Sequence, residues 1–306
     1  MIDLSVNLAG VTLKNPIVVA SGTYGFGHEF AEFYDLSELG AICAKGLTVH
    51  KRDGNPPPRI AETPAGILNS VGLQNPGVDA FCEQEMPYLK RSGTKIIANI
   101  SGNTLEEFTE LSEKVSAAGV DLIEVNISCP NVKHGGLAWG TQPASAAAAT
   151  EAVKKAAAVP VMVKLSPNVT DITEIARAVE AAGADALSLI NTLLGMRIDI
   201  ETRRPILHNN MGGLSGPAVL PVAVRMVYQV AQAVKLPILG MGGVSTGADA
   251  VEMMMAGATA VAVGTACFAD PYAPIKVRDG LADYLQRHHL EQASGLTGTV
   301  RPYESI

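Results

Sequence analysis

Short apolar runs recur along the chain, and between them lie segments whose apolar residues follow helical spacing. The runs are continuously apolar and do not alternate, which is typical of strands covered on both faces, as in a parallel sheet enclosed by helices. Eight strands are predicted, at residues 17–20, 41–44, 95–100, 122–127, 161–165, 186–190, 238–241 and 260–263. Helices are predicted at residues 105–117, 144–157, 172–181, 219–234 and 248–255.

An aliphatic residue followed by glycine precedes several of these strands, which indicates a helix end, a glycine cap and then a strand. The pairs lie at residues 39–40, 118–119, 182–183 and 256–257. Eight strand and helix units favour a (β/α)8 barrel, the α/β fold known as the TIM barrel. An open, doubly wound sheet is the alternative, although no G-x-G-x-x-G motif follows the first strand.

The barrel interpretation predicts one domain over residues 1–306, since barrels of about 250 residues commonly form a single unit. The opening of the chain has its own pattern. Residues 4–6 and 11–13, around Ala9-Gly10, predict a β-hairpin that covers the floor of the barrel before its first strand.

Composition narrows the function classes. The 306 residues are 47% hydrophobic and 17% charged, as in a folded globular protein. The net charge of -7 without a lysine and arginine cluster argues against nucleic acid as a partner. The start lacks signal-peptide features, and the longest uncharged stretch, residues 253–269, is too short to span a bilayer, which predicts a protein with no membrane partner.

Four cysteines are widely spaced, without a C-x-x-C pair for zinc or a run suited to an iron–sulfur cluster: Cys43, Cys82, Cys129 and Cys267. We therefore expect no metal site, and reduced thiols in a cytoplasm.

In a barrel, the site forms where strands end and the following loops begin. Two consecutive strands end in glycine-bearing turns, Gly242-Gly243 and Gly264-Thr265. Bare backbone N–H groups near a helix N-terminus favour an anion, and the turns after strands seven and eight are where barrels usually hold phosphate. Either turn alone could simply permit a tight bend, but together they favour phosphate.

Two lysines, Lys45 and Lys164, stand at the ends of the second and fifth strands. A lysine in a barrel mouth could form a Schiff base, bind phosphate, or place a cation beside an electron-rich cofactor ring. The alternative is a salt bridge to a neighbouring carboxylate.

Asparagines recur at other strand ends: Asn69, Asn99, Asn126 and Asn191. Each amide offers both a donor and an acceptor, so several converging on one mouth suit a planar amide or imide ligand. A single asparagine there would more often cap a turn.

Cys129 follows the fourth strand in Asn126-Ile-Ser-Cys-Pro-Asn131, which places it to reach the site as a reactive thiol. Cys43 and Cys267 lie within apolar segments and are predicted to be inert, buried thiols. The next stretch, residues 132–140, contains several glycines and the one tryptophan, Trp139, and is predicted to form a lid over the ligand.

Taken together, the motifs place the chain close to a known family. The motif around Cys129 occurs with Asn69-Ser-Val-Gly-Leu-Gln-Asn-Pro76, Lys164-Leu-Ser-Pro-Asn168, Asn191-Thr192 and Gly213-Leu-Ser-Gly-Pro217, in the family's order. Over nearly its whole length the chain resembles dihydroorotate dehydrogenase, and most closely the type B catalytic subunits.

The resemblance implies a barrel that binds flavin mononucleotide (FMN) and oxidises dihydroorotate to orotate in pyrimidine synthesis. It implies a catalytic base at Cys129. It implies one FMN held by Ser21, Lys45, Gly46, Asn99, Asn126, Lys164, Ile190, Gly216, Gly242, Gly243, Gly264 and Thr265. It implies substrate contacts from Lys45, Asn69, Ser70, Val71, Gly72, Leu73, Asn126, Asn191 and Thr192.

The resemblance also implies a partner. The chain lacks a dinucleotide fingerprint and cluster cysteines, so electrons would reach NAD+ through a second subunit carrying FAD and a 2Fe–2S centre, in a heterotetramer of two copies of each chain. A type A enzyme using fumarate is the alternative within the family. A lyase with a Schiff base at Lys164, or a barrel that binds flavin only as a scaffold, are alternatives of other classes.

Overall fold

Eight parallel strands form a closed barrel in the computed structural model, which describes residues 2–128 and 139–303. The strands are β3 (Ile17–Val19), β4 (Ala41–Cys43), β7 (Lys95–Ile100), β8 (Leu122–Asn126), β9 (Val161–Lys164), β10 (Ala186–Leu189), β15 (Ile238–Met241) and β16 (Ala260–Val263). The ring closes because β10 pairs with β9 on one side and with β15 on the other. Closure confirms the predicted barrel and excludes the open sheet, and each predicted strand is present with ends within one residue.

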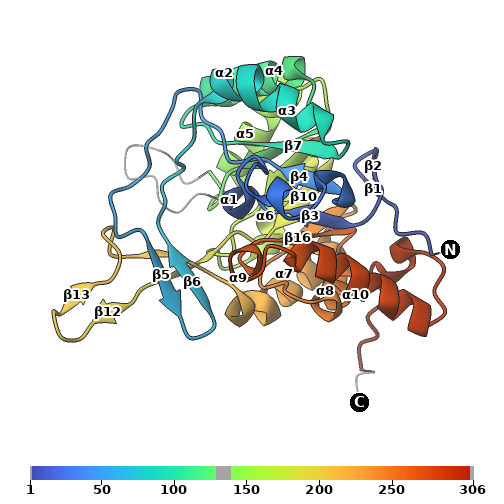
Figure 1. The fold of residues 1–306 in the computed structure, drawn as a ribbon. Coiled ribbons are helices and arrows are strands. Elements are labelled where there is room, and N and C mark those ends of the chain that lie inside the picture. Colours follow the sequence, from blue (N-terminus) through green and yellow to red (C-terminus); the bar gives the residue numbers. More distant parts are fainter. Residues whose placement is uncertain (1, 129–138, 304–306) are drawn as a thin grey trace.

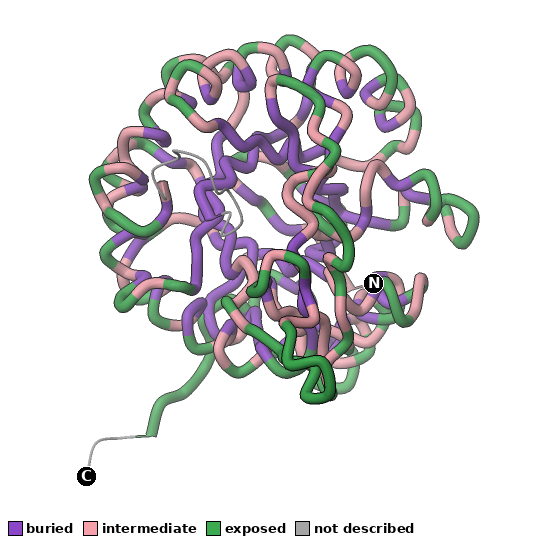
Figure 2. Tube along the Cα trace, turned by 90° about the vertical axis from the view of Figure 1, so that its left-hand side faces the viewer, coloured by how far each residue is buried: buried purple, intermediate pink, exposed green. Residues whose placement is uncertain are grey.

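Helices surround the barrel, and Figure 2 shows the buried strands at its centre with more exposed segments around them. The five predicted helices are present within one residue at each end: α4 (Leu105–Ala118), α5 (Pro143–Ala156), α6 (Ile172–Ala181), α7 (Leu220–Ala233) and α8 (Gly247–Ala256). Further helices, which were not predicted, are α1 (Ser21–Tyr24), α2 (Val78–Ala80), α3 (Met86–Arg91), α9 (Ala266–Ala269) and α10 (Ala273–Arg287), with a π-helical segment at Phe81–Glu85. Within the described residues, no helix is long and apolar enough to cross a membrane.

Of the four predicted pairs of an aliphatic residue and glycine, three lie at the end of a helix. Gly119, Gly183 and Gly257 have φ values of +81°, +91° and +130°, which side chains rarely adopt, and each follows a helix. The interpretation is wrong for Gly40, which follows only a 3-10 turn. There glycine is required by close packing, because a Cβ atom would lie 2.0 Å from the backbone oxygen of Asn15.

The N-terminal hairpin forms, but its first strand is not the predicted one. β1 is Val6–Leu8 and β2 is Val11–Leu13, with Leu8 opposite Val11 across the Ala9-Gly10 turn. The prediction of residues 4–6 was wrong because a two-residue turn brings its immediate neighbours into register. Leu8 and Leu13 are buried in the core, and the hairpin lies at the opposite side of the barrel from β5 and β6 (Figure 1).

A second, four-stranded sheet was not predicted. It contains β5 (Ile60–Thr63), β6 (Gly66–Asn69), β11 (Leu193–Gly195) and β14 (Gly212–Ser215), in the order β11-β14-β6-β5. A small hairpin of β12 (Ile198–Asp199) and β13 (Arg204–Pro205) extends beyond it. β11 begins four residues after β10 ends, so this sheet covers the carboxyl ends of the barrel strands, where barrel sites form.

Candidate active site

One cavity at the carboxyl ends of the barrel strands gathers most of the residues singled out in the sequence. All of the predicted flavin residues line it: Ser21, Lys45, Gly46, Asn99, Asn126, Lys164, Ile190, Gly216, Gly242, Gly243, Gly264 and Thr265. Of the predicted substrate residues, it is also lined by Asn69, Val71, Gly72, Leu73, Asn191 and Thr192. The barrel fold therefore brings segments from the whole chain to one place.

Two predicted residues stand apart from this group. Ser70 is fully buried and is not among the lining residues, and its hydroxyl has no hydrogen-bond partner among the described residues. Successive residues of an extended segment point to opposite sides, so Asn69 and Val71 can face the cavity while Ser70 faces away. Cys129, the predicted base, and most of the predicted lid lie outside the described residues.

Trp139, at the far end of the predicted lid, is described. Its ring packs edge-on against Phe108 of α4, with 5.8 Å between the ring centroids, and it is not among the residues that line the cavity. The tryptophan therefore packs on a helix of the barrel, and the predicted lid over the ligand stays a prediction.

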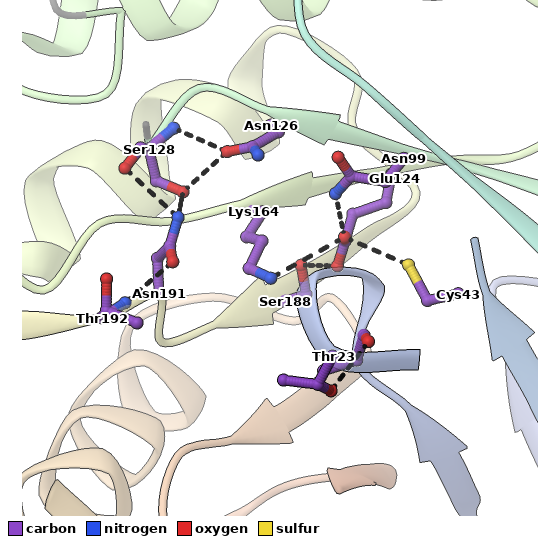
Figure 3. A network of polar contacts seen from close by, with 11 residues as sticks. Thr23, Cys43, Asn99, Glu124, Asn126, Ser128, Lys164, Ser188, Asn191 and Thr192 are labelled. Carbon is purple, nitrogen blue, oxygen red and sulfur yellow. Dashed lines mark hydrogen bonds and ion pairs between the residues drawn. The ribbon is translucent and has the colours of Figure 1, made fainter. Parts of the chain in front are cut away.

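A polar network fixes the segment that leads to Cys129 (Figure 3). The Oδ1 atom of Asn126 accepts hydrogen bonds from the backbone N–H of Ser128 at 3.2 Å and from its hydroxyl at 3.0 Å. The Nδ2 atom of Asn191 donates to the hydroxyl and the backbone oxygen of Ser128, at 2.7 and 3.2 Å. Side chains at the ends of β8 and β10 therefore hold the residue immediately before Cys129.

Lys164 is buried at the end of β9, where its Nζ atom lies 3.9 Å from a carboxylate oxygen of Glu124. The salt bridge that was an alternative for this lysine is therefore present. It does not remove Lys164 from the site, because the side chain also lines the cavity. The buried pair places a positive charge, partly balanced, at the cavity wall.

The glycine turns after β15 and β16, Gly242-Gly243 and Gly264-Thr265, are together called the cradle; the first is tightly packed and the second is open. Gly243 has a φ of +80°, and a Cβ atom there would lie 2.8 Å from the backbone nitrogen of Leu220 and 2.9 Å from the backbone oxygen of Gly216. Gly264 has no neighbour closer than 3.5 Å to the same position, so the second turn is open. Ser245 and Thr265 add hydroxyl groups to the lining. The turns provide the bare backbone surface that a phosphate group needs.

The residues present fit a flavin nucleotide. The cradle suits its phosphate, and the amide groups and lysines of the cavity lining suit a ring with amide-like edges. Asn99 adds a further observation: its side chain belongs to the cavity lining, and its Oδ1 atom is buried with no hydrogen-bond partner among the described residues. An unpaired buried acceptor is costly, and a ring N–H of a bound ligand would satisfy it.

The described cysteines are poor candidates for a reactive thiol. Burial, and then the nearby Glu124 carboxylate, raise the pKa of the Cys43 thiol well above its usual value. Burial raises the pKa of Cys267 to about 12 and that of Cys82 to a lesser extent. A thiol with a raised pKa stays protonated and inert, as the sequence predicted for Cys43 and Cys267.

Sequence reasoning missed Glu124, Thr23, Ser215 and Phe268, of which the last three line the cavity. Glu124 was hidden inside a run that we treated as apolar. A signal was available, since Glu124 and Asn126 are two residues apart on one strand and so must point the same way. Ser215 accepts a hydrogen bond of 2.8 Å from the Thr265 hydroxyl, and it belongs to the sheet that was not predicted.

Fold and cavity together define a (β/α)8 barrel enzyme with its site at the carboxyl ends of the strands. The family model described as dihydroorotate dehydrogenase matches residues 3–285, so the chain belongs to the dihydroorotate dehydrogenase family. A protein of Alkaliphilus oremlandii (strain OhILAs), named "Dihydroorotate dehydrogenase B (NAD(+)), catalytic subunit", is 56% identical over 97% of this chain and 99% of its own length. A protein of the same name from Geobacillus kaustophilus (strain HTA426) is 57% identical over 95% of each chain. The family confirms the resemblance predicted from the motifs.

Proposed function

We propose that this chain is the catalytic subunit of an NAD+-linked dihydroorotate dehydrogenase, which oxidises dihydroorotate to orotate in pyrimidine biosynthesis. One observation carries the proposal: lysines, amides and a glycine cradle from all parts of the chain line a single cavity. Near full-length relatives bear that name, which favours NAD+ over the fumarate-using type A alternative and over a Schiff-base lyase.

The proposed cofactor is one FMN, which would supply the two-electron acceptor when bound. Gly242, Gly243, Gly264 and Thr265 would bind its phosphate, and Lys164 and Asn99 would bind the polar edge of its ring. Lys45, Asn69 and Asn191 would orient the substrate's carboxylate and imide groups through ionic and amide contacts. Cys129 would take a proton from C5 of dihydroorotate, and closure of the predicted lid would exclude water.

A partner subunit is part of the proposal, because the relatives are named as catalytic subunits. It would carry FAD and a 2Fe–2S centre and complete a heterotetramer of two copies of each chain. This division suits the sequence, which has neither a dinucleotide motif nor the cysteines of a cluster. The barrel domain over residues 1–306 and a cytoplasmic location complete the proposal.

The experiment is to purify the chain and identify the pigment it retains, then to add dihydroorotate without oxygen. We expect FMN, bleached by dihydroorotate, and slow reoxidation by NAD+ until the partner subunit is added. Rapid reoxidation by fumarate without a partner would assign the chain to type A. A colourless protein that takes up no FMN would contradict the proposal as a whole.

Replacement of Gly243 by alanine tests the cradle. We expect FMN affinity to fall at least about tenfold, because the new Cβ would press on Leu220 and Gly216 and displace the turn. Gly183→Ala is the matched control, with a similarly positive φ of +91° but nothing within 4 Å of the new atom. Fluorescence titration of the apoprotein with FMN measures both. Equal FMN affinities in the two variants would show that Gly243 is not part of the phosphate site.

A further inference from the structure

Glu124 is a fully buried carboxylate inside the barrel that no step of the proposed function uses. It accepts three hydrogen bonds and forms one ion pair inside the barrel, and all four partner groups can donate a proton (Figure 3). The partners are the amide Nδ2 of Asn99, the hydroxyl of Ser188 at 2.7 Å, the thiol of Cys43 at 3.3 Å and the ammonium of Lys164 at 3.9 Å. A buried carboxylate is tolerated where it is surrounded in this way.

Two of these partners also line the cavity, namely Asn99 and Lys164. Because the Nδ2 atom of Asn99 donates to Glu124, the amide is oriented and its Oδ1 atom is left as an acceptor without a partner among the described residues. Lys164 faces the same carboxylate, so the charge that the lysine presents to the cavity is partly balanced. Glu124 therefore controls two properties of the cavity wall: which amide atom is available, and how positive the wall is.

We propose that Glu124 is a positioning residue that orients Asn99 and limits the positive charge that Lys164 presents to the bound flavin, and so sets the flavin's reduction potential. The proposal rests on the proposed function. Reduction adds negative charge to a flavin, so a neighbouring cation favours the reduced form and a neighbouring carboxylate opposes it. With Glu124 in place, the flavin is held at a lower potential than Lys164 alone would give.

Glu124→Gln tests this with little change of shape. We expect the reduction potential of bound FMN to rise, equivalent to a roughly tenfold stronger preference for the reduced form. Lys164→Ala should shift the potential in the opposite direction, since it removes the cation. If Glu124 served only to stabilise the fold, the two variants would not shift the reduction potential in opposite directions. The readout is a potentiometric titration with a dye of known potential, which does not depend on turnover.

Ser188→Ala is the matched control, because it removes a hydrogen bond to Glu124 but no charge. We expect this variant to unfold more easily and to keep the parental potential. Should Glu124→Gln fail to fold, because Lys164 is then buried without its partner, the double variant Glu124→Gln/Lys164→Ala is compared with Lys164→Ala. Neither of these buries an unpaired cation, and the carboxylate that Lys164→Ala leaves without its lysine keeps its three hydrogen-bond donors. The double variant should have the higher potential of the two.

The outcomes are distinct. A wild-type protein that retains no FMN contradicts the proposed function before any variant is examined. A wild-type protein that binds FMN and is reduced by dihydroorotate, with a Glu124→Gln potential equal to or below its own, overturns the role of Glu124 alone. A Ser188→Ala potential that rises as far as that of Glu124→Gln overturns it as well, since the effect would then not depend on charge.

Discussion

Cys129→Ser is expected to slow the dihydroorotate-dependent bleaching of bound FMN by about 10² to 10⁴, the usual contribution of a positioned general base. The hydroxyl is harder to ionise than a thiol, whose ordinary pKa is about 8.5. The remaining rate should therefore keep rising with pH where the wild-type rate has levelled off. FMN and orotate affinities should change little, because serine is close to cysteine in size. Stopped-flow absorbance across a range of pH measures the rate, and ligand titration measures the affinities.

Cys82→Ser is the matched control for this prediction. Cys82 lies in the π-helical segment Phe81–Glu85, is partly exposed and is not among the residues that line the cavity. We expect wild-type rates from it at every pH. If Cys129→Ser also reduced the flavin at the wild-type rate, the cysteine would have no part in the proton transfer.

Lys164→Ala is expected to have the largest effect on stability. Removing the lysine leaves the Glu124 carboxylate, which is 1% exposed, without its cation. Breaking a buried ion pair from one side typically costs about 3–5 kcal/mol. Urea unfolding of the apoprotein measures this cost without any contribution from the flavin, and the same variant should bind FMN at a lower reduction potential.

Lys154→Ala provides the comparison on the outside of the barrel. Its Nζ atom lies 2.6 Å from Asp185, closer than in the buried pair, but both side chains are about one-third exposed, at 31% and 34%. A partly solvated pair of this kind is worth about 1 kcal/mol or less. If the two lysine variants lost the same small amount of stability, the buried pair would not contribute to the folded state as argued.

The barrel could be predicted from the sequence because its strands are buried on both faces. Runs such as 260–263 can be apolar at every position only where helices cover the outside and side chains fill the inside. Glycine caps such as Gly119 then fix where each helix ends. Family motifs at the strand ends named the cavity residues, because the fold must bring those ends together.

The second sheet could not be predicted for the opposite reason. β5 alternates between exposed and partly buried residues, and β14 begins with two glycines, so neither shows an apolar pattern. Pairing with β6 stabilises both, and pairing leaves no trace in the sequence of a single strand. Glu124 was missed because it lies inside an otherwise apolar run; its place two residues before Asn126 indicated its direction, but its partners are distant in the sequence.

That second sheet links parts of the site that would otherwise be independent. β6 ends at Asn69, β11 starts directly after Thr192, and both pair with β14, which runs on to Gly216 beside the cradle. Because Asn69 and Thr192 are proposed to contact the substrate and Gly216 to contact the flavin, a shift of β14 would move both parts of the proposed site at once. Substitutions on this one strand should alter recognition of both molecules together.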